Sequence, residues 1–157
     1  MELQRIRSVV LDNERRVWVY LPPGYDPGQD AGHAPYAVLV VFDALAYLHA
    51  IPTPAILDNL LAAHKLPPCV ALFVDNVDRD HELPCSAPFA DFLAHELLGW
   101  ARERYPLTSD PARTVVAGSS YGGLAATFAG FRHSEVFGAV LSQSGAFWWR
   151  PEGGCRA

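Results

Sequence analysis

The sequence has little positive charge and no long hydrophobic run, and these two absences exclude broad classes of protein. Its 12 Lys and Arg residues are outnumbered by 17 Asp and Glu, and the net charge of −5 argues against nucleic acid as a partner. No apolar run approaches the roughly 18–20 residues that span a bilayer, so no membrane partner is expected. The N-terminal residues mix charged and apolar side chains and do not form the hydrophobic core of a secretory signal.

Cysteine and histidine are scarce and lack the spacings of metal sites. Cys69, Cys85 and Cys155 form no CxxC pattern, so we expect reduced thiols, as in cytoplasmic proteins. His81 and His95 each begin the tripeptide HEL, but neither continues as HExxH, and a zinc-binding helix is therefore not supported. We expect no metal ion and no other cofactor.

The chain of 157 residues has enough apolar side chains for one domain with a buried core. Half of the residues are hydrophobic and 18% are charged, which argues against disorder. Continuous apolar runs, typical of strands that are covered on both faces, alternate with helical patterns. The expected strands are 36–43, 69–76, 113–119 and 137–145, and the expected helices are 55–65, 89–105 and 121–131. This alternation predicts an α/β three-layer sandwich around a mostly parallel sheet.

The segments between these elements carry hairpin and loop signals. Residues 3–11 and 15–22 are rich in β-branched and aromatic side chains and predict an N-terminal antiparallel hairpin with its turn at 12–14. The segments 22–35 and 77–88 are broken by proline and rich in polar residues, so both are predicted to be loops.

The segment GSSYG, residues 118–122, matches the G-x-S-x-G pattern with Ser120 at its centre. Ser119 does not match, because Tyr121 stands where the second glycine would be. The pattern lies between a predicted strand and a predicted helix, which is the context of a nucleophilic serine. A sharp turn there would expose the Ser120 hydroxyl, and we expect a Cβ at Gly118 or at Gly122 to clash with the other residue. An ordinary glycine-rich turn with Ser120 as helix N-cap is the alternative.

A serine nucleophile also needs hydrogen-bond donors for the oxyanion that forms on the substrate. The start of the following helix would supply the N–H of Tyr121. The loop after the predicted strand 36–43 would supply a second N–H, from Ala44 or Leu45. Asp43 is expected to order this loop through backbone hydrogen bonds.

The motifs HELPC, RTVVAG-S-GG and LSQSG-FWW lie in a stretch, roughly 15–150, that resembles the catalytic domain of enterochelin (enterobactin) esterases, in the esterase D-like branch of the α/β-hydrolases. The resemblance implies a cytoplasmic serine esterase whose small-molecule substrate is a catecholate siderophore. Ser120 would attack the lactone esters and form an acyl-enzyme, and hydrolysis would release iron. The resemblance also places Asp43, Ser119, Trp148 and Trp149 at the substrate, with core packing as the alternative for the two tryptophans.

The expected partners of Ser120 are not evident in the sequence. In α/β-hydrolases the acid and the histidine follow the serine along the chain. The only later histidine is His133, which a helix would place about 20 Å from Ser120, and we expect it on the surface. The later carboxylates are Glu135 and Glu152. His81 is a hypothetical substitute base, because it follows the predicted strand 69–76. Its orienting acid would be Asp75, Asp78 or Asp80.

These departures favour a single, partial α/β-hydrolase domain, residues 1–157, whose C-terminal strands, acid and histidine are missing. The last predicted strand, 137–145, would then present an unpaired edge that favours association. Three functions stay open: a serine esterase for a catecholate siderophore, a general carboxylesterase or thioesterase of the esterase D type, and an inactive remnant that binds a ligand. The sequence does not reveal the oligomeric state.

Overall fold

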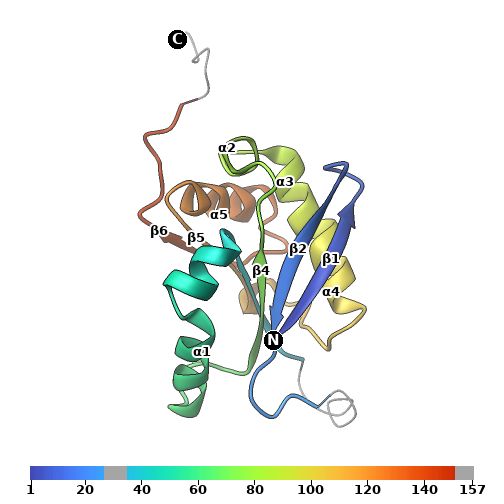
Figure 1. The fold of residues 1–157 in the computed structure, drawn as a ribbon, viewed down its shortest axis with the longest axis vertical. Coiled ribbons are helices and arrows are strands. Elements are labelled where there is room, and N and C mark those ends of the chain that lie inside the picture. Colours follow the sequence, from blue (N-terminus) through green and yellow to red (C-terminus); the bar gives the residue numbers. More distant parts are fainter. Residues whose placement is uncertain (27–34, 151–157) are drawn as a thin grey trace.

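The computed structural model describes residues 1–26 and 35–150 (Figure 1). Most of the predicted loop 22–35, together with Cys155 and Glu152, lies outside the described residues. Within the described part, six strands form one sheet of order β1-β2-β4-β3-β5-β6. They are β1 (Glu2–Ser8), β2 (Asn13–Tyr20), β3 (Ala37–Val41), β4 (Cys69–Val74), β5 (Thr114–Ser119) and β6 (Ala139–Gln143).

The directions of the strands confirm a mostly parallel sheet with an N-terminal antiparallel hairpin. β1 and β2 pair antiparallel, β2 pairs antiparallel with β4, and β4, β3, β5 and β6 run parallel. The hairpin turn lies at residues 9–12, which is earlier than predicted. The Glu96 carboxylate accepts the N–H groups of Val9 and Val10 and thereby fixes this turn.

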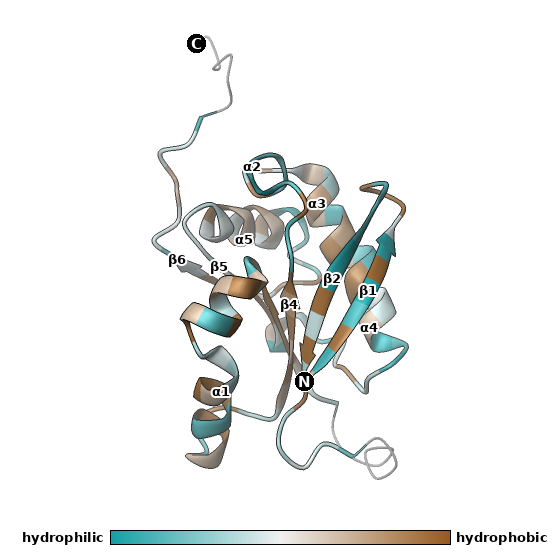
Figure 2. Cartoon of the chain, in the orientation of Figure 1, coloured by the Kyte–Doolittle hydropathy of each residue, from teal (hydrophilic) through white to brown (hydrophobic). Residues whose placement is uncertain are grey.

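Helices cover both faces of the sheet, as the three-layer prediction requires. One face packs against η2 (Ala46–Ala50) and α1 (Thr53–Ala62). The other packs against α3 (Ala87–Asp91), η3 (Phe92–Leu97), α4 (Leu98–Arg102) and α5 (Tyr121–Arg132). The central strand β4 is buried along its whole length and its side chains alternate between the two cores, whereas β1 and β2 alternate between apolar and polar residues (Figure 2).

Two predicted segments have more helical structure than their sequence patterns indicated. The expected loop 77–88 contains a short helix, α2 (Arg79–Glu82), because the Asp78 side chain accepts the N–H of His81 and caps it. The expected helix 89–105 begins after Ser86, whose hydroxyl accepts the N–H of Phe89, and it passes through the π-helical turn η3. A short 3₁₀ helix, η4 (Pro111–Arg113), precedes β5. None of the helices in the described ranges is long and apolar enough to cross a membrane.

The last strand, β6, is an edge strand. In the described part of the chain it pairs with β5 alone, and Val140 and Leu141 are 42% and 51% exposed. The unpaired edge that the sequence predicted is therefore present in the structure.

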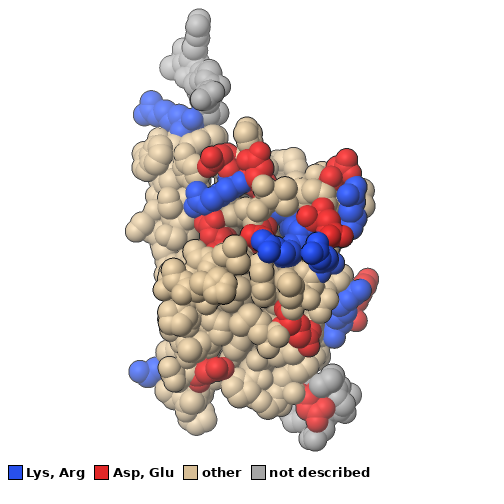
Figure 3. Space-filling view, viewed as in Figure 1, with Lys and Arg blue, Asp and Glu red and all other residues tan. Residues whose placement is uncertain are grey.

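On the face shown in Figure 3, basic and acidic side chains are interspersed, and few charged side chains lie over α1.

Candidate active site

Ser120 occupies a sharp turn between β5 and α5, at the carboxyl edge of the sheet. Its backbone has φ 55° and ψ −119°, a conformation that non-glycine residues rarely adopt. The end of β6 and the segment after it hold this turn in place, because the Gln143 carbonyl accepts the Ser120 N–H and the Ala146 N–H donates to the Ser120 carbonyl, both at 3.0 Å. The predicted strand–turn–helix context is thus present, with the strain that the pattern implies.

The two glycines of the pattern are unequal. A Cβ on Gly118 would lie 2.4 Å from the Gly122 carbonyl group, so a side chain there is excluded by backbone atoms. A Cβ on Gly122 would lie 3.4 Å from an Asp43 carboxylate oxygen, which is an ordinary contact. The prediction of a clash is therefore right for Gly118 and wrong for Gly122.

Ser120 is an exposed residue. Ser120 stands at the N-cap position of α5, but its hydroxyl makes no capping hydrogen bond. The amides of the first helical turn, beginning with Tyr121, have no acceptor within the helix and point out of its N-terminus. The alternative role of Ser120 as a capping residue therefore lacks its hydrogen bond, whereas the positive end of a helix lies next to the hydroxyl.

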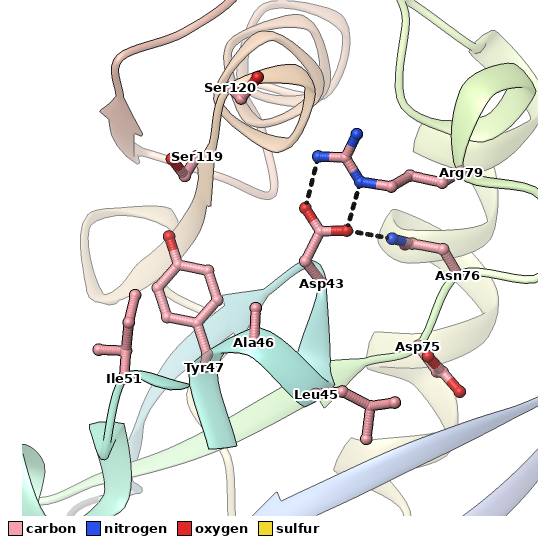
Figure 4. A pocket seen from close by; sticks show the side chains of 10 residues that line it. All are labelled: Asp43, Leu45, Ala46, Tyr47, Ile51, Asp75, Asn76, Arg79, Ser119 and Ser120. Atoms are coloured by element: carbon pink, nitrogen blue, oxygen red, sulfur yellow. Dashed lines mark hydrogen bonds and ion pairs between the residues drawn. The ribbon is translucent and has the colours of Figure 1, made fainter. Parts of the chain in front are cut away.

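A pocket of about 540 Å³ opens beside Ser120. Its walls come from the ends of three strands, β3, β4 and β5, or from the segments that follow them, and Figure 4 shows the side chains around it. The lining residues are Asp43, Leu45, Ala46, Tyr47, Ile51, Asp75, Asn76, Arg79, Ser119 and Ser120. Of the residues predicted at the site, the pocket thus brings together Ser119, Ser120, Asp43 and Leu45.

Asp43 orders the loop after β3, but mainly through its side chain. Its carboxylate accepts hydrogen bonds from Asn76 Nδ2 at 2.6 Å and from Arg79 Nε and Nη2 at 2.7 and 2.9 Å (Figure 4). Its backbone, at φ 54°, contributes the carbonyl that accepts the N–H of Ala46 and starts the following helix. The prediction of backbone ordering is incomplete, because the carboxylate also binds two side chains from elsewhere, Asn76 after β4 and Arg79 of α2.

The two N–H groups predicted as oxyanion donors in the loop after β3, those of Ala44 and Leu45, lie at the start of a helix. Ala44 and Leu45 form the first turn before η2, where amides have no intrahelical acceptor. Leu45 lines the pocket, whereas Ala44 is fully buried. Which of the two N–H groups would serve as the second oxyanion donor stays a prediction.

The aromatic residues lie beside the pocket. The Tyr121 ring lies 6.0 Å from the Trp148 ring and 5.6 Å from the Arg79 guanidinium carbon. Trp148 is 73% exposed, and neither Trp148 nor Trp149 is among the residues that line the pocket. Trp148 therefore lies at the rim of the site, next to Tyr121, whereas no contact among the described residues places Trp149 there.

Sequence reasoning missed four polar residues at this edge. Asn76 and Arg79 bind Asp43, and the Tyr47 hydroxyl donates to Gln143 Oε1 at 2.5 Å. Burial, together with the charge of Asp43, raises the pKa of Tyr47, so its hydroxyl remains a donor at neutral pH. The sequence could have indicated three of them. Asn76, Arg79 and Gln143 end or follow predicted strands, and the carboxyl ends of parallel strands meet at one edge of the sheet.

The histidines considered as bases lie away from the pocket. The His81 side chain is 85% exposed, and its Nδ1 lies 3.0 Å from the Asp78 carboxylate, a hydrogen bond that raises the pKa of His81. His133 is buried, so the predicted surface position is wrong; its ring contacts the carboxylates of Asp91 and Glu135. Among the described residues, no histidine lines the pocket, and no group of three or more His, Cys, Asp or Glu could hold a metal ion.

Comparisons with known proteins found similar sequences and structures. The family model described as "Putative esterase" matches residues 8–155. The chain is 43% identical to the iron(III) enterobactin esterase of Dickeya dadantii (strain 3937), over 91% of this chain and 32% of the relative. It is 39% identical to the iron(III) enterobactin esterase of Escherichia coli (strain K12), over 94% of this chain and 36% of the relative. The chain thus spans about a third of the length of these curated relatives.

Solved structures share the fold. The enterobactin esterase of Shigella flexneri, crystallised in the presence of enterobactin, superposes with a TM-score of 0.84 at 36% identity. The match covers 94% of this chain and 38% of the Shigella chain. The sheet order, the two helical layers and this likeness together identify the α/β-hydrolase type of fold that the sequence predicted.

Proposed function

Because the chain belongs to the esterase family, we propose that it carries the nucleophile and the oxyanion donors of a serine ester hydrolase. The observation that carries the proposal is the backbone of Ser120. A residue with φ 55° at the N-terminus of α5 holds an uncapped, exposed hydroxyl against the pocket.

The proposal gives each group a role in the acylation step. Ser120 Oγ attacks the ester carbonyl carbon, and the carbonyl oxygen takes the negative charge. The N–H groups of Tyr121 and of Leu45 or Ala44 stabilise that oxyanion. Loss of the alcohol leaves an acyl-enzyme on Ser120, which water then hydrolyses.

A base must accept the Ser120 proton during this step. Since no described histidine lines the pocket, we expect the 157-residue chain to acylate slowly and to turn over more slowly still. Serine hydrolases that lack their triad keep a residual rate through the oxyanion hole and substrate binding, roughly 10³–10⁴ above water.

We propose a catecholate siderophore ester as the substrate, cleaved in the cytoplasm. The support is the names of the relatives and the exposed aromatic rim of Tyr121 and Trp148, on which catechol rings can stack. A general carboxylesterase or thioesterase would lack this preference. Hydrolysis of a catecholate trilactone that exceeds hydrolysis of p-nitrophenyl acetate supports the siderophore, whereas the reverse order supports the general esterase.

The assignment of Ser120 is tested with a fluorophosphonate probe, which reacts with an activated serine and places its phosphoryl oxygen in the oxyanion hole. Because no described histidine lines the pocket, we expect slow labelling of the wild-type chain at Ser120 and no labelling of Ser120→Ala, as read by mass spectrometry after a long incubation. Ser119→Ala is the matched control, because Ser119 is the neighbouring hydroxyl and lines the same pocket. Equal labelling of Ser120→Ala and wild type would refute the assignment.

A second candidate function is binding without turnover. It is favoured by the same absence of a described histidine from the pocket. In that case, quenching of tryptophan fluorescence would report binding of the trilactone, while neither hydrolysis nor fluorophosphonate labelling would be detected.

A further inference from the structure

We propose that Arg79 is a positioning residue. It fixes the relative positions of the two segments that donate N–H groups to the oxyanion, the loop after β3 and the turn between β5 and α5. The inference rests on the proposed function, and it assigns a role to a side chain that does not itself take part in bond making. Arg79 lies on α2, outside both segments, yet it contacts Asp43 in the first and Tyr121 in the second.

The first contact is with Asp43, which precedes the donors Ala44 and Leu45. Arg79 Nε and Nη2 each bind one oxygen of the Asp43 carboxylate, and Asn76 binds the oxygen shared with Nε. A two-pronged pair of this kind fixes orientation as well as distance. Asp43 needs this restraint, because its φ of 54° is unfavourable without surrounding contacts that impose it.

The second contact is with Tyr121, which follows Ser120 and carries the other N–H. The guanidinium carbon of Arg79 lies 5.6 Å from the centre of the Tyr121 ring, within the range of a cation–π contact. A single side chain therefore touches both donor-bearing segments. The two segments also lie against each other directly, since the position of a Cβ on Gly122 is 3.4 Å from the Asp43 carboxylate.

The helix that carries Arg79 is itself anchored. Glu82, three residues later, forms a buried two-pronged pair with Arg15 of β2, with Arg15 Nη2 at 2.7 Å from Glu82 Oε1 and Nη1 at 3.2 Å from Oε2. The Arg15 guanidinium also packs over Phe92, 4.6 Å from the ring centre. Glu82 accepts the Val77 N–H as well. The position from which Arg79 reaches Asp43 is thus fixed to the sheet.

The expected consequence is kinetic. Oxyanion donors act only when they are held where the charge develops, and a displacement of about 1 Å can cost roughly 100-fold in rate. We expect Arg79→Gln to lower the maximal rate of fluorophosphonate labelling of Ser120 by roughly 10- to 100-fold. The half-saturating probe concentration should change little. The labelling rate of Arg79→Lys should lie between those of the wild type and Arg79→Gln, because one ammonium group cannot bind both carboxylate oxygens in the two-pronged way of a guanidinium.

Arg132→Gln is the matched control. Arg132 binds Asp91 with the same Nε and Nη2 geometry and has a similarly exposed side chain, 40% against 41% for Arg79, but it lies at the far end of α5. Its labelling rate should equal that of the wild type, at a temperature where thermal unfolding shows all variants folded. Free guanidinium ion should raise the labelling rate of Arg79→Ala and leave that of Arg132→Ala unchanged.

The outcomes separate the two proposals. If the wild type labels at Ser120 and folded Arg79→Gln labels equally fast, the role of Arg79 is refuted and the nucleophile stands. If Arg79→Gln and Arg132→Gln slow equally, the effect is one of stability, and the positioning role is also refuted. If Arg79→Gln does not fold, the labelling rate of Arg79→Lys is compared with that of the wild type instead, and an equal rate refutes the role of Arg79. An unlabelled wild type overturns both proposals together.

Discussion

At the scale of single residues, the turn at Ser120 depends on one close approach of the backbone. Gly118, two residues before the serine, faces the carbonyl group of Gly122 so closely that no Cβ fits. Gly122 faces the Asp43 carboxylate at an ordinary distance and lies within α5. Of the two glycines in the pattern, Gly118 is required because backbone atoms occupy the place of a side chain, whereas a methyl group fits at Gly122.

This asymmetry predicts different results for two alanine substitutions. Gly118→Ala should lower the free energy of unfolding by about 2–3 kcal/mol and abolish labelling of Ser120, because the new Cβ forces the turn apart. Gly122→Ala should change the free energy of unfolding by less than about 1 kcal/mol, since alanine favours a helix and the contact is ordinary. Urea unfolding of both variants measures the difference. Equal destabilisation would contradict the steric argument.

At the scale of elements, a cluster of charged side chains joins the end of α5 to α3. Arg132 and His133 at the end of α5 both bind Asp91 of α3, and Glu135 binds the other nitrogen of the His133 ring. The hydrogen bond from Arg132, together with His133, lowers the pKa of Asp91 to about 2. The cluster therefore ties the C-terminal end of α5, the end far from Ser120, to α3.

The lowered pKa of Asp91 gives a pH dependence of defined sign. The unfolded chain binds the proton first as the pH falls, so the contribution of Asp91 is complete above about pH 4 and is lost as the pH falls to about 2. Wild type should be more stable than Asp91→Asn at pH 6, and this advantage should vanish toward pH 2. Thermal unfolding across this range, with Glu103→Gln as the control for loss of one exposed carboxylate, measures it. A constant difference between wild type and Asp91→Asn would contradict the argument.

At the scale of the whole molecule, β6 forms one edge of the sheet within residues 1–26 and 35–150. An apolar pocket of about 490 Å³ lies between α1 and the strands β3, β5 and β6, and Leu141 of the edge strand is among its lining residues. An exposed edge with unpaired backbone groups next to apolar surface is a site of strand pairing between chains. We therefore expect this arrangement to favour association of the chain.

We accordingly expect the 157-residue chain to form concentration-dependent oligomers in sedimentation velocity experiments. Leu141→Lys should shift the distribution toward monomer, because a charge on an edge strand opposes pairing. Val9→Lys is the control, since Val9 is 83% exposed but lies in the hairpin turn, away from β6. The same degree of association in Leu141→Lys and Val9→Lys would exclude β6 as the contact.

The sequence by itself determined the elements and the position of the candidate nucleophile. The buried run of β4, the helical spacing of α5 and the glycine two residues before Ser120 are properties of neighbouring residues, because burial on two faces and the sterics of a turn act locally. The rule that parallel strands share a carboxyl edge then indicated which loops form the pocket.

Only the tertiary structure decided which side chains meet across that edge. Arg79 binds Asp43 from 36 positions away, and His133 binds Asp91 from 42 positions away. Local periodicity carries no information on such pairs, since the partners are matched by the packing of separate elements onto one sheet. For this reason the sequence predicted a free surface histidine and a loop ordered by its own backbone. The fold instead buries His133 and ties Asp43 to α2.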